Sequence, residues 1–407
     1  MIADKLAVFS LRRGHFAWPQ CIGLGVLVTG MSLMGAVPAA AGQSLARRTV
    51  DHSALAVRIV DALALLPGER VLLVGHPQFA EALVRPLRLE IVRRGGVDLG
   101  FIEVLAHPWP EGQDLATRSR ERAALHEMFQ RVDAAIMLPG ATSDHPEYQA
   151  MYDVLASGHG RTIHLHWDAN GSVGVVPGQP APPAHEVDRV YERAILDVDL
   201  TELRRAQHAF IAALRSGEAR VTTPDGTDLR FRIGDRPVNR QDGDASAARA
   251  DTARMLVDRE IELPAGAVRV APVESSVVGV VAVPISWWAG REVRDLRLTF
   301  RRGRVVEVTA RSGAEHVLRE LDAGGDAARA FREFALGFNP VLAVPDPRHW
   351  IPYYGYGAGV VRLALGDNQE LDGGVRGTYV RIILLRDASV SVGGRPWVLQ
   401  GHLQVPN

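Results

Sequence analysis

The chain has 407 residues, of which 47% are hydrophobic, enough to form two ordinary domain cores. Lys and Arg together number 46 and Asp and Glu 47. This balance gives no sign of nucleic-acid binding, which depends on clustered positive charge. The single cysteine, Cys21, lies in the first segment of the chain, so the remainder has no means of forming a disulfide framework or a cysteine-ligated metal site.

Residues 1–41 have the features of an export signal. Basic residues occur between positions 5 and 13, residues 21–41 carry no charge, and the small side chains at 39–42 suit a signal peptidase. We expect cleavage here and a periplasmic or secreted protein. The uncharged stretch is also long enough to span a bilayer, so a membrane anchor at residues 21–41 is the alternative.

Residues 42–184 alternate apolar runs with helical patterns. Residues 70–75 form a continuous apolar run, as a strand buried on both faces of a parallel sheet requires. The full pattern predicts strands at 70–75, 98–105, 132–139 and 161–167, and helices at 79–94, 114–131 and 147–156. This alternation is typical of a doubly wound α/β domain with a mostly parallel sheet.

Residues 185–407 are predicted to form a second, β-rich α+β domain. A stretch rich in Gly, Pro and Val at 171–183 indicates a linker, so we place the boundary near residue 185. A helix is predicted at 187–216 with a break near Asp197. Beyond it the pattern predicts strands at 219–233, 267–272, 277–284, 293–300 and 304–310, and a helix at 327–334.

The segment His164-Leu-His166-Trp-Asp168 is one candidate for metal binding. Alternation along a strand puts the two histidines and the aspartate on one face, and such a set suits zinc or iron. The competing interpretation is that these polar residues mark the end of a strand, where side chains meet solvent. Spacing alone leaves both open.

Two segments near the end of the chain, residues 359–368 and 373–385, resemble the C-terminal signature of the aminopeptidase T family of metallopeptidases. Shorter segments at 66–74, 221–231, 263–272 and 333–340 extend this similarity in the same order. The superfamily also includes a ring-cleaving 2,5-dihydroxypyridine dioxygenase. The resemblance implies the family's fold, a homodimer and a site that holds divalent metal ions.

Most metal ligands that the resemblance implies are replaced in this sequence. One of five expected ligands, Glu333, is retained, and the other four positions are Ala267, Arg362, Tyr379 and Arg381, while Gln369 stands near the position of the peptidase tyrosine. A divalent ion needs three or more protein ligands, and a guanidinium group stays protonated and cannot serve. We therefore expect no metal cofactor at this site.

The first functional hypothesis is an altered, metal-free hydrolase of a small peptide, amide or ester. Glu333 would act as the base, Tyr379 as the proton donor, and Arg362 and Arg381 as binders of substrate oxygens. Aromatic side chains for the substrate would come from Tyr353, Tyr354 and Tyr356.

This hypothesis requires Glu333, Arg362 and Arg381 to converge. Tyr379 and Arg381 are two residues apart, so on a strand they share one face, as a His-x-Asp pair must to share a metal. One alternative is a non-catalytic protein that binds a small anionic ligand with the same residues. A further alternative is a metal-dependent aminopeptidase or ring-cleaving dioxygenase whose ligands lie elsewhere.

Overall fold

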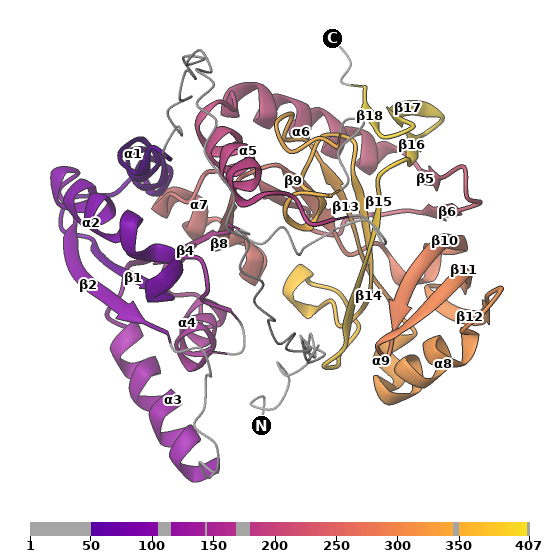
Figure 1. Cartoon of the computed structure of the whole chain (residues 1–407), viewed down its shortest axis with the longest axis horizontal. Helices are drawn as coiled ribbons and strands as arrows, with labels where there is room; N and C mark the ends of the chain where they lie inside the picture. The colour runs from indigo at the N-terminus through magenta and orange to yellow at the C-terminus, as the bar shows by residue number, and fades with distance from the viewer. Residues whose placement is uncertain (1–49, 105–114, 143–144, 168–179, 345–349, 405–407) are drawn as a thin grey trace, which may run out of the picture.

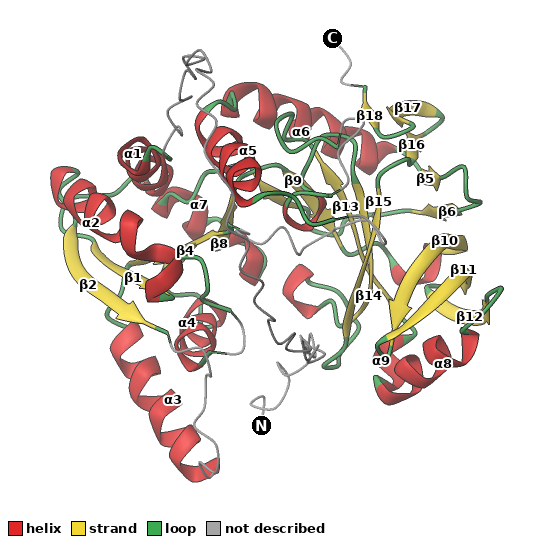
Figure 2. Ribbon diagram, viewed as in Figure 1, coloured by secondary structure: helices red, strands yellow, loops and turns green. Residues whose placement is uncertain are grey.

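The computed structural model describes residues 50–104, 115–142, 145–167, 180–344 and 350–404. The predicted export signal at 1–41, Asp168 and most of the predicted linker at 171–183 lie outside these residues. Within the described part of the chain, no helix is both long and apolar enough to cross a membrane. Figures 1 and 2 show helices packed around strands in the first part of the chain and a strand-rich second part.

The first part is a parallel sheet of five strands with the order β2-β1-β3-β4-β8. Its strands are β1 (Arg70–Gly75), β2 (Val97–Glu103), β3 (Ala134–Met137), β4 (Arg161–Leu165) and β8 (Glu260–Leu263). Helices α1 (His52–Leu63) and α2 (Pro77–Arg93) supply one set of core residues, and α3 (Leu115–Phe129) and α4 (Pro146–Ala156) supply another.

Strand β1 shows why this sheet has helices on both faces. Val71 and Leu73 pack in one hydrophobic cluster with α1 and α2, whereas Leu72 and Val74 pack in another with α3 and α4. Successive side chains of a strand point to opposite faces, so an apolar run buries both. The predicted doubly wound α/β class is therefore confirmed.

The second part combines two long helices with two antiparallel sheets. Helices α5 (Ala184–Leu196) and α6 (Leu200–Ser216) flank the predicted break at Asp197. One sheet has the order β12-β11-β10-β6-β5-β16-β17-β18 and the other β15-β14-β13-β9-β7. The strands are β5 (Ala219–Thr222), β6 (Asp228–Phe231), β7 (Asn239–Gln241), β9 (Ala267–Val270), β10 (Val278–Trp288), β11 (Arg291–Arg301), β12 (Arg304–Thr309), β13 (Phe331–Gly337), β14 (Val361–Gly366), β15 (Val380–Leu385), β16 (Ser389–Val392), β17 (Arg395–Leu399) and β18 (His402–Leu403).

Short elements connect these strands: the helices α7 (Ala247–Asp251), α8 (Ala314–Ala323) and α9 (Gly325–Ala328), and the 3-10 turns η1 (Leu256–Asp258), η2 (Glu274–Ser276), η3 (Tyr353–Gly355) and η4 (Gln369–Leu371). Strand β8 lies beyond residue 185 yet pairs with β4 in the first sheet. The chain therefore returns to the first sheet after the predicted boundary, and this return brings β8 close to the residues of the second part.

The helix predicted at 327–334 is wrong. Only Gly325–Ala328 is helical, and Phe331–Gly337 is strand β13, which pairs with both β9 and β14. The spacing of Phe331 and Phe334 suits a helix face, but on β13 both are buried in the core. Charged Arg332 and Glu333 between them are buried as well, which the apolar pattern does not anticipate because it assumes that charges face solvent.

Candidate functional site: a buried cluster of arginines and glutamates

One face of the sheet β15-β14-β13-β9-β7 carries charged residues. The register places Arg269 of β9 opposite Ala335 of β13, and Ala335 opposite Arg362 of β14. Glu333 lies two residues before Ala335 and so shares its face. A register shift between Phe331 and Glu333 adds Arg332 to the strand, and such irregularities redirect side chains. Three arginines thus meet around one glutamate.

The side chains of this cluster form a continuous set of ion pairs. Arg362 Nη2 lies 2.6 Å from Glu333 Oε1, and Arg269 Nη2 lies 3.0 Å from Glu333 Oε2. Arg269 Nη2 is also 2.7 Å from Oε1 of Glu370, which Arg332 Nη2 contacts as well. Arg332 Nε is 3.8 Å from Glu333 Oε2. We call these five residues the arginine–glutamate cluster.

Burial makes the charge balance of this cluster important. Glu333 is 1% exposed and Arg362 3%. Burial by itself would raise the pKa of Glu333, but Arg269, Arg362 and Arg332 together outweigh burial and hold that pKa well below its ordinary value. Glu333 therefore stays a carboxylate, and it has little tendency to take up a proton. This argues against the predicted role of Glu333 as a general base.

A second group of titratable residues lies beside the cluster on β4 and β8, with His166 and Glu262 toward the carboxyl ends of these strands. His164 Nδ1 is 3.6 Å from Glu260, and His166 Nε2 is 3.8 Å from Glu262. The His164 and His166 ring centroids are 3.9 Å apart. Tyr148 of α4 donates a hydrogen bond of 2.5 Å to Glu260. Ligands of open parallel sheets bind at this edge, which makes this group a functional candidate.

Tyr356 connects the two groups. Its hydroxyl donates a hydrogen bond to Glu262 of the first sheet, and the Arg362 guanidinium lies 5.5 Å from the centre of its ring. The Tyr354 ring is 5.9 Å from the same guanidinium and 5.7 Å from the His166 ring. Tyr354 and Tyr356 therefore lie beside Arg362, and their role in binding substrate stays a prediction. The side chain of Tyr353 lies outside the described residues.

The prediction that Arg381 and Tyr379 join Glu333 is wrong. Arg381 Nη1 lies 3.0 Å from Glu320 of α8, and the Tyr379 hydroxyl donates a hydrogen bond of 2.9 Å to the same carboxylate. The two do share a face, as their spacing predicts. However, Arg362 pairs with Leu384 and Arg381 with Leu365, so Arg381 points to the opposite side of the sheet.

The error has a simple geometric cause. On β15 the residues that share a face with Arg362 and Glu333 are Val380, Ile382 and Leu384, because they pair with Gly366, Ala364 and Arg362. Arg381 instead packs on Trp288, with its guanidinium carbon 4.1 Å from the ring centre, and therefore acts as a structural contact.

The residues at the implied ligand positions do not fit a divalent metal. Ala267 has no donor atom, and both oxygens of Glu333 are held by guanidinium groups. Gln369 donates a hydrogen bond of 2.6 Å to Asp367. Among the residues that the structure describes, no group of three or more His, Cys, Asp or Glu side chains is placed to hold a metal ion. His164 and His166 do lie together, while Asp168 is outside the described residues.

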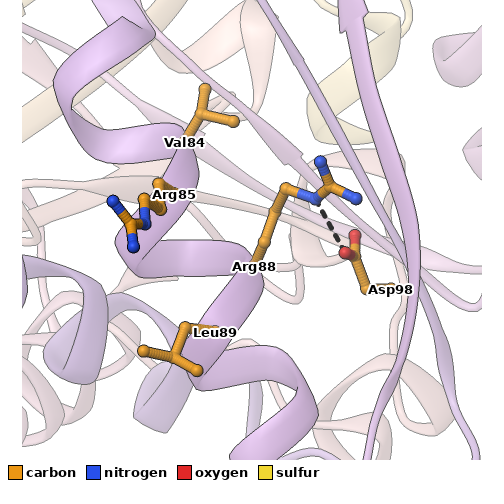
Figure 3. A pocket seen from close by; sticks show the side chains of 5 residues that line it. All are labelled: Val84, Arg85, Arg88, Leu89 and Asp98. Carbon is orange, nitrogen blue, oxygen red and sulfur yellow. Dashed lines mark hydrogen bonds and ion pairs between the residues drawn. The ribbon is translucent and has the colours of Figure 1, made fainter.

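Sequence reasoning did not find Arg269, Arg332, Glu370, Glu260 or Glu262. Two sequence patterns pointed toward some of these residues. Arg269 is two positions after Ala267 and so shares its face of a strand, and Glu260 and Glu262 alternate along β8 as His164 and His166 do along β4. Neither pattern shows which sheets meet. A shallow depression lined by Val84, Arg85, Arg88, Leu89 and Asp98, between α2 and β2, contributes no residue to this site (Figure 3).

The stability of the protein should fall as the pH drops below 6.5, the ordinary pKa of histidine. Burial, His164 and Arg362 together lower the pKa of His166 well below that value, although Glu262 lies 3.8 Å away. The unfolded chain therefore binds a proton that the folded protein excludes, and the free energy of unfolding decreases between pH 6.5 and the lowered pKa. We expect His166→Gln to flatten this slope in urea titrations between pH 5 and 7. The control His402→Gln, at an exposed position, should retain it, and an unchanged slope in His166→Gln would contradict the assignment.

Comparison with known proteins places this geometry in context. Residues 201–342 match the family model described as thermophilic metalloprotease (M29). The fold is similar to that of wild-type AmpT from Thermus thermophilus, with a TM-score of 0.60 and 19% identity, covering 88% of this chain and 100% of that one. It is also similar to 2,5-dihydroxypyridine dioxygenase from Pseudomonas putida KT2440, with a TM-score of 0.59 and 15% identity, covering 88% and 97%. No curated protein sequence matches significantly. The family model and the fold confirm the resemblance to the aminopeptidase T family.

Proposed function

We propose that this protein is a peptidase-like hydrolase of a small peptide, amide or ester that works without a metal ion. The general class is supported by the family-model match and by the AmpT-like fold. The observation that carries the metal-free form is the position of Arg269 and Arg362, whose guanidinium groups hold Glu333 at the place where the resemblance implies metal ions. Fixed positive charge of this kind stabilises an oxyanion.

Two buried donors support this role for the arginines. The Nε atoms of Arg269 and Arg362 have no hydrogen-bond partner among the described residues, although both side chains are buried. A buried donor without a partner is costly. An oxygen that becomes negative as a carbonyl is attacked would satisfy such a donor, and the attraction would be strongest in the transition state.

The base in this proposal is Glu262 rather than Glu333. Glu333 is held as a carboxylate by three arginines, whereas the described partners of Glu262 are His166 and the Tyr356 hydroxyl. Glu262 takes a proton from the attacking water while the water oxygen bonds to the carbonyl carbon. The same proton then passes from Glu262 to the leaving amine or alcohol. Burial and Glu262 raise the pKa of Tyr356 well above its ordinary value, so its hydroxyl keeps its proton and orients the carboxylate.

A chelator and one substitution test this proposal. Turnover of a panel of small peptides, anilides and esters should survive treatment with EDTA, and Glu262→Gln should lower kcat by about 100-fold or more, the usual worth of a general base. Glu320→Gln is the matched control, because Glu320 lies with Arg381 on the other side of the sheet. Stoichiometric zinc, cobalt, manganese or iron in the purified protein would contradict the proposal.

A second candidate is a non-catalytic protein that binds a small anionic ligand. The observation that favours it is the state of Glu333, the one retained ligand position, which is fully engaged by arginines and offers no base. Binding of an anion with no turnover across the substrate panel would decide for this candidate.

A further inference from the structure

Glu370 differs from the other members of the arginine–glutamate cluster in position and exposure. It belongs to the 3-10 turn η4, between β14 and β15, whereas Glu333 lies within β13. Its side chain is 24% exposed, compared with 2% for that of Glu333. Its charge also acts on Tyr152 of α4, whose pKa is raised first by burial and then by Glu370. Glu370 therefore lies at the more exposed rim of the arginine–glutamate cluster, on the side that faces the first sheet.

The contacts of Glu370 occupy only part of what its arginines offer. Arg269 uses the single atom Nη2 to contact both Glu333 and Glu370, while its Nε has no hydrogen-bond partner among the described residues. Arg332 also contacts Glu370 through Nη2. Arginine binds carboxylates most strongly when two nitrogens on one edge hold the two oxygens. Arg269 contacts Glu370 through one nitrogen only, instead of two.

We propose that Arg269 and Arg332 form a binding site for the carboxylate of a small ligand, and that Glu370 occupies this site as an internal substitute. The positive charge explains the need for such a substitute. Three buried guanidinium groups lie against Glu333, so without Glu370 they would share a single carboxylate, and uncompensated buried charge is costly. A ligand carboxylate supplies the same charge and can also reach Arg269 Nε, which leaves Arg362 Nε for the oxyanion of the proposed reaction.

This inference deepens the proposed function, on which it rests for the class of substrate: a small peptide or amide that carries a free carboxylate. Binding requires the ligand to displace Glu370, which moves away from Arg269 and Arg332 toward solvent. Glu370 therefore lowers the apparent affinity for every carboxylate by the same competition, because only the fraction of molecules with a displaced Glu370 is competent to bind.

Calorimetric titration of the full chain with acetate and N-acetylglycine tests the inference directly. We expect Glu370→Gln and Glu370→Ala to bind both compounds at least about tenfold more tightly than the wild type, a change of ~1.4 kcal/mol. The variants should lose thermal stability without ligand and recover more of it than the wild type when acetate is added. Glu320→Gln, which frees Arg381 instead, should bind no more tightly than the wild type.

The double variant Arg332→Gln, Glu370→Gln should lose the gain in affinity for acetate and N-acetylglycine, because one of the two binding arginines is absent. Equal affinity in the wild type, Glu370→Gln and Glu370→Ala would overturn the inference, as would an equal gain in Glu320→Gln. Inorganic phosphate in place of acetate shows whether the site selects carboxylates. If Glu370→Gln bound phosphate more tightly than acetate, the carboxylate assignment would be overturned. Binding is measured without turnover, so tighter binding by Glu370→Gln together with no turnover by the wild type across the substrate panel would leave this inference standing and reject the hydrolase.

Discussion

Replacing Arg362 by alanine should lower the free energy of unfolding by about 3 kcal/mol, the cost of leaving a buried charge with one partner fewer. Arg362 Nη2 lies 2.6 Å from Glu333, whose side chain is 2% exposed, so the remaining carboxylate cannot be hydrated without opening the sheet. Arg269 and Arg332 still neutralise part of the charge of Glu333. We therefore expect the loss in free energy of unfolding to lie near the lower end of the range for broken buried ion pairs. Urea denaturation at pH 7 measures it.

Arg381→Ala is the matched control for this experiment. Both arginines lie on neighbouring strands and pair with a glutamate, but the side chains of Arg381 and Glu320 are 25% and 19% exposed. Partly exposed pairs contribute little, so we expect a loss of about 1 kcal/mol or less. The sequence-based hypothesis assigned both arginines to one site. A loss as large as that of Arg362→Ala would therefore contradict the separation of Arg381 from the arginine–glutamate cluster.

The triple variant Arg269→Met, Glu333→Leu, Arg362→Met should unfold with the same free energy as the wild type or with one higher by ~1–4 kcal/mol, because apolar residues of similar volume avoid the desolvation cost of buried charges. Arg332 and Glu370 remain as a pair. The same variant should lose all turnover and all binding of acetate. Urea denaturation and calorimetric titration on one protein preparation measure both effects.

This variant decides whether the arginine–glutamate cluster is only structural. A triple variant that keeps its stability and loses ligand binding assigns the cluster to function, because the fold does not need the charges. A triple variant as unstable as Arg362→Ala would show that the charges hold the sheets together. Glu320→Gln, on the other face, serves again as the control for stability and binding.

The order of elements could be read from the sequence because it depends on local patterns. The apolar run at 70–75 became a strand buried on both faces, and the break near Asp197 separates α5 from α6. Tyr379 and Arg381 share a face, as period-two alternation requires. The replacement of the implied metal ligands by Ala267 and Arg362 was likewise visible in the residues themselves.

The composition of the site was decided by tertiary structure. Which face of β15 meets Glu333 depends on the register with β14, in which Arg381 pairs with Leu365 and its side chain reaches Glu320 instead. Arg269 and Glu370 are 101 positions apart in the chain and meet only because β9, β13 and β14 are neighbours. The sequence by itself determined which residues stand at the ligand positions that the resemblance implies. Only the packing of the strands decided that three arginines would surround the remaining glutamate, because long-range pairing, and not local pattern, determines which charges are buried together.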